Sequence, residues 1–204
     1  MCDITVVIPS IPPRKTDLAR AMASVEAQTH LATAVVVEYD TTGDGPAMVR
    51  NRALERVDTT WVAFLDDDDY LLPDHLAVLC QAAEESGADV VWPWFRVEGG
   101  TDPFPMHRGR QWNPDDPHQI PITTLVRTDA IREVGGFRTI PDGPTDKLGN
   151  RAGEDWTLWL ALSAAGYRFH HVNRVTWVWR HHGANTSGLP ARWMKTANQR
   201  RVRL

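Results

Sequence analysis

The most concentrated chemistry in the sequence is a run of four aspartates, Asp66 to Asp69, directly after the apolar residues 61–65. Carboxylates this close repel each other by roughly 1 kcal/mol per pair even in water. A solvated acidic turn is one interpretation of such a run. The residues before it, however, predict a buried strand, and open α/β sheets bind ligands at the carboxyl ends of strands. Hard carboxylate oxygens there suit Mg²⁺ or Mn²⁺ shared with a phosphate; the Gly and Glu of an EF-hand loop are missing.

A second acidic pair, Glu154 and Asp155, opens a helix that we expect over residues 154–165. An Asp in the first turn of a helix is kept ionised by the helix dipole and by unpaired backbone N–H groups. Such an ionised carboxylate can serve as a general base that takes a proton from a hydroxyl. A simple helix cap explains the same position, so both interpretations stay open.

The elements that must position these carboxylates alternate between strand and helix in the first half of the chain. Buried strands are expected over 4–8, 34–39 and 61–65, and a fourth over 88–94 that ends at Pro93. Helices are expected from the spacing of Leu18 to Val25, from Pro46 onward, and over 74–86 with Pro73 as the first helical residue. This order predicts an α/β fold with a mostly parallel central sheet flanked by helices.

The second half is less regular. A long loop or short hairpin is expected over 96–120, and a short strand and turn over 122–137. A loop rich in Gly and Pro follows, then the helix that begins with Glu154 and two short strand-like runs over 167–172 and 174–179. We expect one domain over 1–188 and a basic tail over 189–204.

Composition narrows the classes of protein that fit. With 204 residues and 42% hydrophobic content, the chain can form one core of ordinary size. The net charge of -4 gives no general attraction to nucleic acid or anionic membranes. Cys2 and Cys80 are far apart in sequence and form no metal-ligand pattern, which favours a reducing compartment or indifference to redox, with Cys80 in the core.

No apolar run is long enough to span a bilayer and no signal peptide is recognisable, so we expect a soluble, cytoplasmic protein. Arg is far more frequent than Lys, which favours GC-rich coding DNA such as that of an actinobacterium or one of its phages.

The order of several motifs resembles the family 2 glycosyltransferases of the GT-A fold. The motifs are TVVIPS, EYDTTGDGP, MVRNRAL, FLDDDDYLLPDHL, VGGF, EDWTLWL and WRHHGANTS, and together they cover about residues 4–188. The resemblance implies a metal-dependent, inverting transfer of sugar from a nucleoside-diphosphate sugar, best a UDP-sugar, to an acceptor hydroxyl. It also implies that residues 1–95 form the nucleotide-sugar-binding half of the domain and residues 96–188 the acceptor-binding half. The acceptor stays open among a glycan, a lipid carrier, a protein and a modified nucleobase.

The resemblance also implies roles for individual residues. Asp66 and Asp68 occupy the acidic motif that holds Mn²⁺ or Mg²⁺ on the donor, with Asp68 the direct ligand and His182 a second one. Asp155 occupies the position of the catalytic base, and Glu154 stands beside it. The expected donor pocket consists of Pro9, Ser10, Asp40, Arg50, Asp66, Asp67 and Arg180. Tyr39 and Trp179 depart from the family pattern, and Tyr39 leaves the nucleobase open.

Trp112 and Trp156 are the aromatic residues that we expect to contact the acceptor, because indole rings offer flat apolar faces to sugars.

Three other functions also fit part of the sequence. A phosphatase of the haloacid dehalogenase type needs its Asp motif after the first strand and a supporting Lys. A nucleotidyltransferase needs a Gly-rich, Lys-bearing first loop, which is PSIPPRK here. A non-catalytic sugar- or nucleotide-binding module has no need for both sets of carboxylates.

Overall fold

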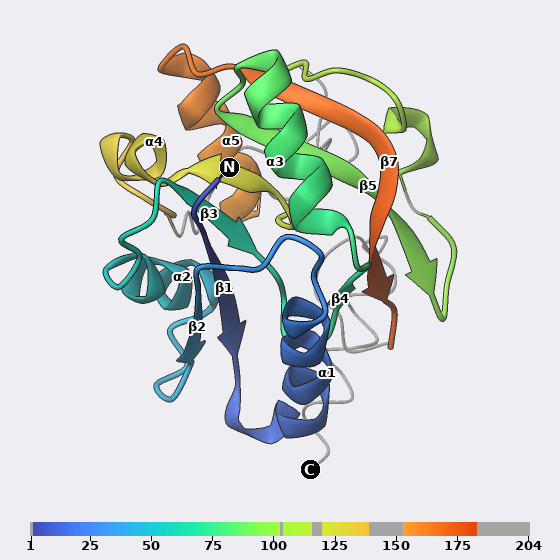
Figure 1. The fold of residues 1–204 in the computed structure, drawn as a ribbon. Coiled ribbons are helices and arrows are strands. Elements are labelled where there is room, and N and C mark those ends of the chain that lie inside the picture. Colours follow the sequence, from blue (N-terminus) through green and yellow to red (C-terminus); the bar gives the residue numbers. More distant parts are fainter. Residues whose placement is uncertain (1, 103, 116–119, 139–152, 183–204) are drawn as a thin grey trace.

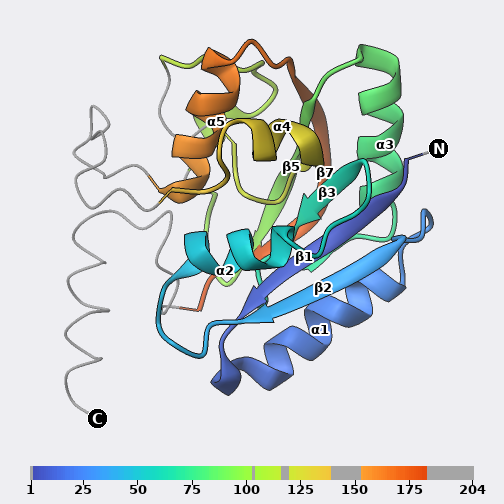
Figure 2. The same ribbon diagram turned by 90° about the vertical axis from the view of Figure 1, so that its left-hand side faces the viewer.

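The computed structural model describes residues 2–102, 104–115, 120–138 and 153–182, which form a seven-stranded sheet with helices on both faces (Figures 1 and 2). Its strands are β1 (Ile4–Ser10), β2 (Ala34–Tyr39), β3 (Trp61–Phe64), β4 (Tyr70–Leu71), β5 (Val90–Glu98), β6 (Leu125–Arg127) and β7 (Phe169–Arg180). Its helices are α1 (Lys15–Glu26), α2 (Pro46–Leu54), α3 (His75–Ser86), α4 (Thr128–Glu133) and α5 (Glu154–Ala164), with 3-10 turns at Pro12–Arg14 and Pro105–His107.

The strand order is β2-β1-β3-β6-β5-β7-β4. The pairs β1·β2 and β1·β3 are parallel, as the alternation of strands and helices predicts, and β5·β7 is parallel as well. The short strand β6 lies between β3 and β5 and runs antiparallel to both, and β4 is antiparallel to β7. Strands β2, β1, β3, β5 and β7 therefore run in one direction, and only β6 and β4 of the described strands run in the other. The sheet is mixed and mostly parallel, which confirms the expected fold class.

Two apolar cores fill the space between the sheet and its helices. Helices α1 and α3 cover one face, where Leu18 and Leu79 belong to the same core as Ile4 and Ile8 of β1. Helices α2, α4 and α5 cover the other face, where Trp159 belongs to the second core. Figure 2 shows the two layers of helices on opposite sides of the strands. The alternation of side chains along a strand explains how β1 serves both cores.

Two prolines do not mark the boundaries that the sequence predicts. Helix α3 begins at His75 with Asp74 as its N-cap residue, so Pro73 precedes the helix and its carbonyl accepts a hydrogen bond from the backbone N–H of Thr29. Strand β5 continues past Pro93 to Glu98. The register with β7 shifts on both sides of Trp94, and this irregularity accommodates a residue that has no N–H to donate.

The two predicted strand-like runs near the end form the single strand β7. Pro93 of β5 pairs with Val172, but the next residue, Trp94, pairs with Val175. Asn173 and Arg174 are exposed within the strand, and this interruption explains why the sequence pattern divides there. Between β5 and β6, the described residues contain one 3-10 turn and otherwise irregular chain, as expected.

Cys2 and Cys80, 78 residues apart in sequence, form a disulfide between the residue before β1 and the middle of α3, which the expected indifference to redox did not include. The prediction that Cys80 belongs to the core is confirmed, since that residue is 5% exposed. Among the described residues, no helix is both long and apolar enough to cross a membrane.

Candidate active site

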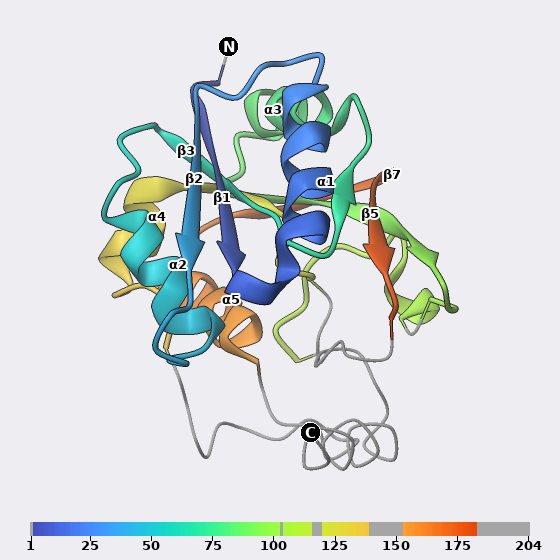
Figure 3. The same ribbon diagram turned by 90° about the horizontal axis from the view of Figure 1, so that it is seen from below.

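Most of the predicted site residues gather where the central strands end, and Figure 3 shows the molecule from below. Ser10 ends β1, Asp40 follows β2, and the four aspartates follow β3 and Leu65. Parallel strands bring their carboxyl ends to the same edge, so three stretches distant in sequence meet there. The start of α5 and the end of β7 supply further polar side chains through the contacts described below.

Asp67 is the structural anchor of the acidic run. Its side chain is nearly buried and accepts a hydrogen bond from Oγ of Ser10 at 2.7 Å. The backbone N–H of Ile11 and the guanidinium of Arg14 also donate to this carboxylate, at 3.4 and 2.9 Å. These contacts fix the aspartate turn to the end of β1, so the predicted donor-pocket residues Ser10 and Asp67 touch each other.

Asp68 and Asp69 are buried carboxylates in a crowded acidic cluster. Asp66, Asp68 and Asp69 each offer an oxygen, and these oxygens all lie within 4.8 Å of one another. Burial, reinforced by the charge of Asp66, raises the pKa of Asp68 and raises that of Asp69 well above its ordinary value. The hard oxygen donors of this cluster fit Mg²⁺ or Mn²⁺.

Two basic side chains reach Asp68. Arg14 Nη1 lies 2.9 Å from Oδ2 of Asp68 and bridges it to Asp67. Burial acts to lower the pKa of Arg14, but Asp67 and Asp68 outweigh that effect and raise it. His182 Nε2 lies 2.9 Å from the same Oδ2, so the two predicted metal ligands, Asp68 and His182, are in direct contact.

Arg50 links the aspartate run to the second acidic pair. It is 3% exposed, and Nη2 donates to Asp66 at 2.6 Å while Nη1 pairs with Glu154. The guanidinium carbon lies 5.6 Å from the ring centroid of Phe137. Burial acts to lower the pKa of Arg50, but Asp66, Glu154 and Asp155 together raise it. The sequence predicted a donor-pocket arginine, and the structure turns its charged nitrogens toward two carboxylates.

Asn51 and Phe137 form a clamp beside that arginine. Asn51 donates through Nδ2 to the carbonyl of Phe137 and accepts through Oδ1 from its backbone N–H, both at 2.8 Å. A Cβ added to Gly136 would lie 2.6 Å from Oδ1 of Asn51, and Gly136 has φ +74°. Glycine there is explained by both the close approach and the backbone conformation. Phe137 also packs edge-to-face on Phe64 of β3.

Glu154 and Asp155 occupy the first turn of α5, after the N-cap residue Gly153. Glu154 is held by Arg50. Oδ1 of Asp155 accepts the backbone N–H of Trp156 at 2.7 Å, and its charge acts on Arg50. Both carboxylates are half-buried. Through Arg50, this pair is therefore connected to Asp66 at the end of β3.

Asp40 organises the loop that follows β2. Its carboxylate accepts backbone N–H groups of Gly43, Asp44 and Gly45 at 2.7 to 2.9 Å. Its small burial acts to raise its pKa, but these three hydrogen bonds outweigh that and lower it. Pro9 is half-buried and pairs with Glu38 in the β1·β2 ladder. Both residues lie at the expected strand ends, while their roles toward a nucleotide stay predictions.

Arg180 approaches the acidic run from the end of β7. Its backbone N–H donates to Asp69 Oδ1 at 2.8 Å. Its side chain contacts Asp17 at 2.8 Å and Glu98 at 3.3 Å, and a longer contact of 3.5 Å reaches the carbonyl of Asp68. Arg180 thus joins α1 and β5 to the acidic edge.

The two predicted acceptor tryptophans lie in different places. Trp156 is buried in the first turn of α5, next to Asp155. Trp112 donates through Nε1 to Ser163 at 3.0 Å and stacks on Phe169 at 4.9 Å. Ser163 is eight residues beyond Asp155, or about 12 Å along the helix. Trp112 therefore packs against the other end of α5 from the acidic pair.

Sequence reasoning missed three participants. Arg14 follows the first strand end by four residues, and a basic residue so placed could have been matched to the acidic run. The sequence pattern does not identify Asp69 as a metal ligand, but its carboxylate belongs to the cluster with Asp66 and Asp68. Asn51 was not singled out, because its partner Phe137 is 86 residues away. Residues 183–204, which include the predicted basic tail, are not among the described ones.

Two hollows lie away from this edge. One of about 370 Å³ lies between α3 and β7 and is lined by residues such as Val78, Ala82 and Val172. The other, of about 310 Å³, lies between α2 and α4. Neither hollow is lined by a residue of the acidic run. The candidate site is therefore identified by its clustered carboxylates and not by an enclosed cavity.

Comparison with known proteins points to one family. The family model described as glycosyl transferase family 2 matches residues 14–139. The succinoglycan biosynthesis protein ExoW of Rhizobium meliloti is 34% identical over 136 residues, which cover 53% of this chain and 42% of ExoW. An uncharacterized Sinorhizobium fredii protein, y4gI, is 32% identical over 136 residues, 64% of this chain and 14% of its own length. The chain thus spans less than half the length of these curated relatives.

Solved structures of S. aureus TarS share the fold. TarS 1-349 aligns with a TM-score of 0.68 at 16% identity, covering 87% of this chain and 60% of that one. TarS 1-349 in complex with UDP-GlcNAc gives a TM-score of 0.69, also at 16% identity, over 88% of this chain and 59% of that one. The fold is GT-A. With the family model matched over more than half of its length, the chain belongs to glycosyl transferase family 2.

Proposed function

We propose that this chain transfers a sugar from a nucleoside-diphosphate sugar, with UDP as the best nucleotide, to an acceptor hydroxyl with inversion, using Mn²⁺ or Mg²⁺. The observation that carries the proposal is the cluster of Asp66, Asp68 and Asp69 oxygens at the carboxyl end of β3. Family membership supports the type of reaction, and the TarS complexes with UDP and UDP-GlcNAc support the class of donor.

On the donor side, Asp66, Asp68 and Asp69 would hold the cation, with His182 beside Asp68. A cation bound there stabilises the negative charge that develops on the departing diphosphate. Arg14 holds Asp67 and Asp68 in place, and Ser10 fixes Asp67 to β1. These contacts keep the acidic turn in one arrangement before the donor binds, which limits the reorganisation needed during the reaction.

On the acceptor side, Asp155 is the proposed general base. The acceptor oxygen forms a bond to the anomeric carbon of the sugar while the bond from that carbon to the diphosphate oxygen breaks. Asp155 takes the hydroxyl proton, which makes the acceptor a better nucleophile. A single displacement of this kind inverts the anomeric configuration. Glu154, held by Arg50, orients the acceptor.

Product analysis on a panel of donors tests the proposal. The protein is incubated with Mn²⁺ and UDP-, GDP- or TDP-sugars, with or without simple glycosides as acceptors, and the released nucleotides are separated. Glycosyl transfer or slow donor hydrolysis releases a nucleoside diphosphate. A nucleotidyltransferase would instead use a nucleoside triphosphate and release pyrophosphate, and a binding module would bind a donor without releasing either. Either of the last two results would contradict the proposal.

A further inference from the structure

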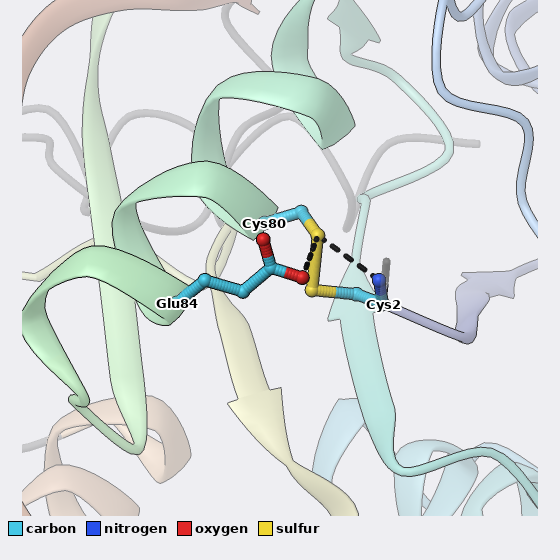
Figure 4. Close-up of side chains that lie close together, drawn as sticks. All are labelled: Cys2, Cys80 and Glu84. Atoms are coloured by element: carbon cyan, nitrogen blue, oxygen red, sulfur yellow. Dashed lines mark hydrogen bonds between the residues drawn. A yellow bond between two sulfur atoms is a disulfide. The ribbon is translucent and has the colours of Figure 1, made fainter.

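A second cluster of potential metal ligands lies at the other end of β1 from the acidic edge. Cys2, Cys80 and Glu84 each offer a ligand atom, and the three atoms lie within 4.8 Å of one another. Figure 4 shows the two sulfur atoms joined as a disulfide with the Glu84 carboxylate turned toward them. β1 separates this cluster from Ser10 by about 20 Å, so it is independent of the proposed sugar-transfer site.

The three side chains come from elements that hold them together without a metal. Cys80 and Glu84 are four residues apart on α3 and therefore share one face of the helix. Oε1 of Glu84 lies 3.8 Å from Sγ of Cys80. Cys2 precedes β1, and the Cα atoms of the two cysteines are 5.8 Å apart. Helix spacing and the packing of α3 on the sheet thus place the three side chains next to one another, and the disulfide bond joins the two sulfur atoms.

Two further contacts act on this cluster. The backbone N–H of Cys2 donates to Sγ of Cys80 at 3.1 Å. Such a donor stabilises a negatively charged thiolate sulfur more strongly than a neutral one. Nε2 of His30 lies 2.9 Å from the carbonyl oxygen of Cys2 and helps to fix the chain at this residue. Outer contacts of this kind orient metal ligands in proteins.

The burial of the cluster differs between its two sides. Cys2 and Cys80 are 8% and 5% exposed, so the sulfur atoms are shielded from solvent. Glu84 is exposed, and it leaves an open side through which an ion and a water molecule can enter. Two sulfur ligands, one carboxylate and one water match the four-coordinate preference of Zn²⁺, whose ligands are thiolates, imidazoles and carboxylates.

We propose that the reduced form of this chain binds one thiolate-preferring divalent cation, of the Zn²⁺ class, through Cys2, Cys80 and Glu84. A dithiol reductant supplies the two electrons and two protons that open the disulfide; it is itself oxidised to a disulfide, and this chain gains two thiols. Binding the cation then releases the two thiol protons, and no electron moves. The disulfide form cannot bind in this way because its sulfur atoms are joined to each other. Redox state therefore decides between a covalent and a metal-mediated link from the start of β1 to α3.

Co²⁺ is a suitable probe, because cobalt bound to thiolates has a sulfur-to-metal charge-transfer band in the near ultraviolet that carboxylates do not produce. The full chain is reduced anaerobically with a phosphine, freed of reductant, and titrated with Co²⁺. The same titration is made on the disulfide form. The expected result is a thiolate band that saturates at about one equivalent in the reduced protein, is absent in the disulfide form, and disappears when Zn²⁺ is added.

Matched variants locate the ligands. Cys80→Ser should abolish the band, and Glu84→Gln should weaken Co²⁺ binding at least tenfold. Glu85→Gln is the control, because Glu85 is the next residue of α3 and pairs with Gln81 instead. The disulfide form is a folded negative control that needs no mutation. Absence of the band from the reduced protein would overturn the proposal, as would equal Co²⁺ affinity in Glu84→Gln and the unchanged chain.

Discussion

Among single residues, neighbouring carboxylates of the acidic run have different environments, and the proposed function depends on these differences. Asp67 is saturated by Ser10, Ile11 and Arg14, which suits an anchor. Asp68 and Asp69 are buried with raised pKa values, which suits groups that receive a cation. Four identical side chains in sequence therefore differ in burial and in partners, and these differences suit two different roles.

Asp155→Asn tests the proposed base. Asparagine keeps the shape of the side chain and can still accept the N–H of Trp156, but it cannot take a proton. Turnover should fall by about 10²–10⁴-fold while donor and Mn²⁺ affinity stay near those of the unchanged chain. Steady-state kinetics and calorimetry on the same preparations measure both quantities. Full activity would refute the role of Asp155, and loss of donor binding would identify it as structural.

Arg50→Lys tests whether the arginine acts through the carboxylates that it joins. Lysine keeps the charge but cannot reach Asp66 and Glu154 with two separate nitrogens in a planar fork. We expect a loss of turnover larger than the loss of donor affinity, with an increased Mn²⁺ requirement, because Asp66 is no longer held. Arg52→Lys on the same helix is the control, since Arg52 pairs with Glu38 and Asp44 instead. Equal effects in both variants would contradict this role.

At the scale of elements, the acidic turn between β3 and β4 should make stability depend on pH. The pKa of Asp69 is raised in the folded protein, so folding favours its protonated form. That contribution to stability is complete below the ordinary value of 3.8 and is lost as pH rises through the folded pKa. Without metal, Asp69→Asn should therefore lose less stability than the unchanged chain between about pH 4 and 8. Urea unfolding in EDTA across this range measures the difference, and parallel curves would contradict it.

The clamp between α2 and Phe137 gives a second prediction at this scale. Gly136→Ala places a Cβ 2.6 Å from Asn51 Oδ1 and forces alanine into a left-handed conformation. Gly166→Ala is a matched control, because Gly166 has φ +88° and an added Cβ there meets nothing within 4 Å. The control should lose about 1–2 kcal/mol from backbone strain alone, and Gly136→Ala should lose more. Equal unfolding free energies from urea denaturation would show that the clamp tolerates the clash.

Sequence patterns could predict the first half of the fold well, since buried strands and amphipathic helices leave periodic signals there. The strand β2 matches its predicted range, and α2 begins at Pro46 as expected. The predicted strand end at Pro93 and helix start at Pro73 were wrong, because a bulge and a pre-helical turn can each accommodate a proline. The acidic run was identified from position alone, whereas the partners of Arg14 and Asn51 depend on contacts across 53 to 86 residues. No local pattern encodes such contacts.

At the scale of the whole molecule, the disulfide closes a long loop. Cys2 and Cys80 are 78 residues apart in sequence, and this loop contains the strand ends at Ser10 and the acidic run. The chain-entropy model gives a stabilisation of about 4.5 kcal/mol for a loop of this length. Reduction in EDTA should lower the free energy of unfolding by up to about that amount, and Cys80→Ser should not respond to reductant. Insensitivity of the unchanged chain to reductant would mean that the disulfide does not stabilise the fold.

Calorimetry of UDP binding with Mn²⁺ and with EDTA, on the unchanged chain and on Asp68→Asn, tests whether the acidic cluster binds the donor through a cation. Mn²⁺ should tighten UDP binding at least tenfold in the unchanged chain, because we propose that the diphosphate and the carboxylate cluster share the cation. In Asp68→Asn, whose fold is checked by circular dichroism, most of that gain should disappear. Equal UDP affinity with Mn²⁺ and EDTA, or an undiminished Mn²⁺ effect in Asp68→Asn, would contradict the account.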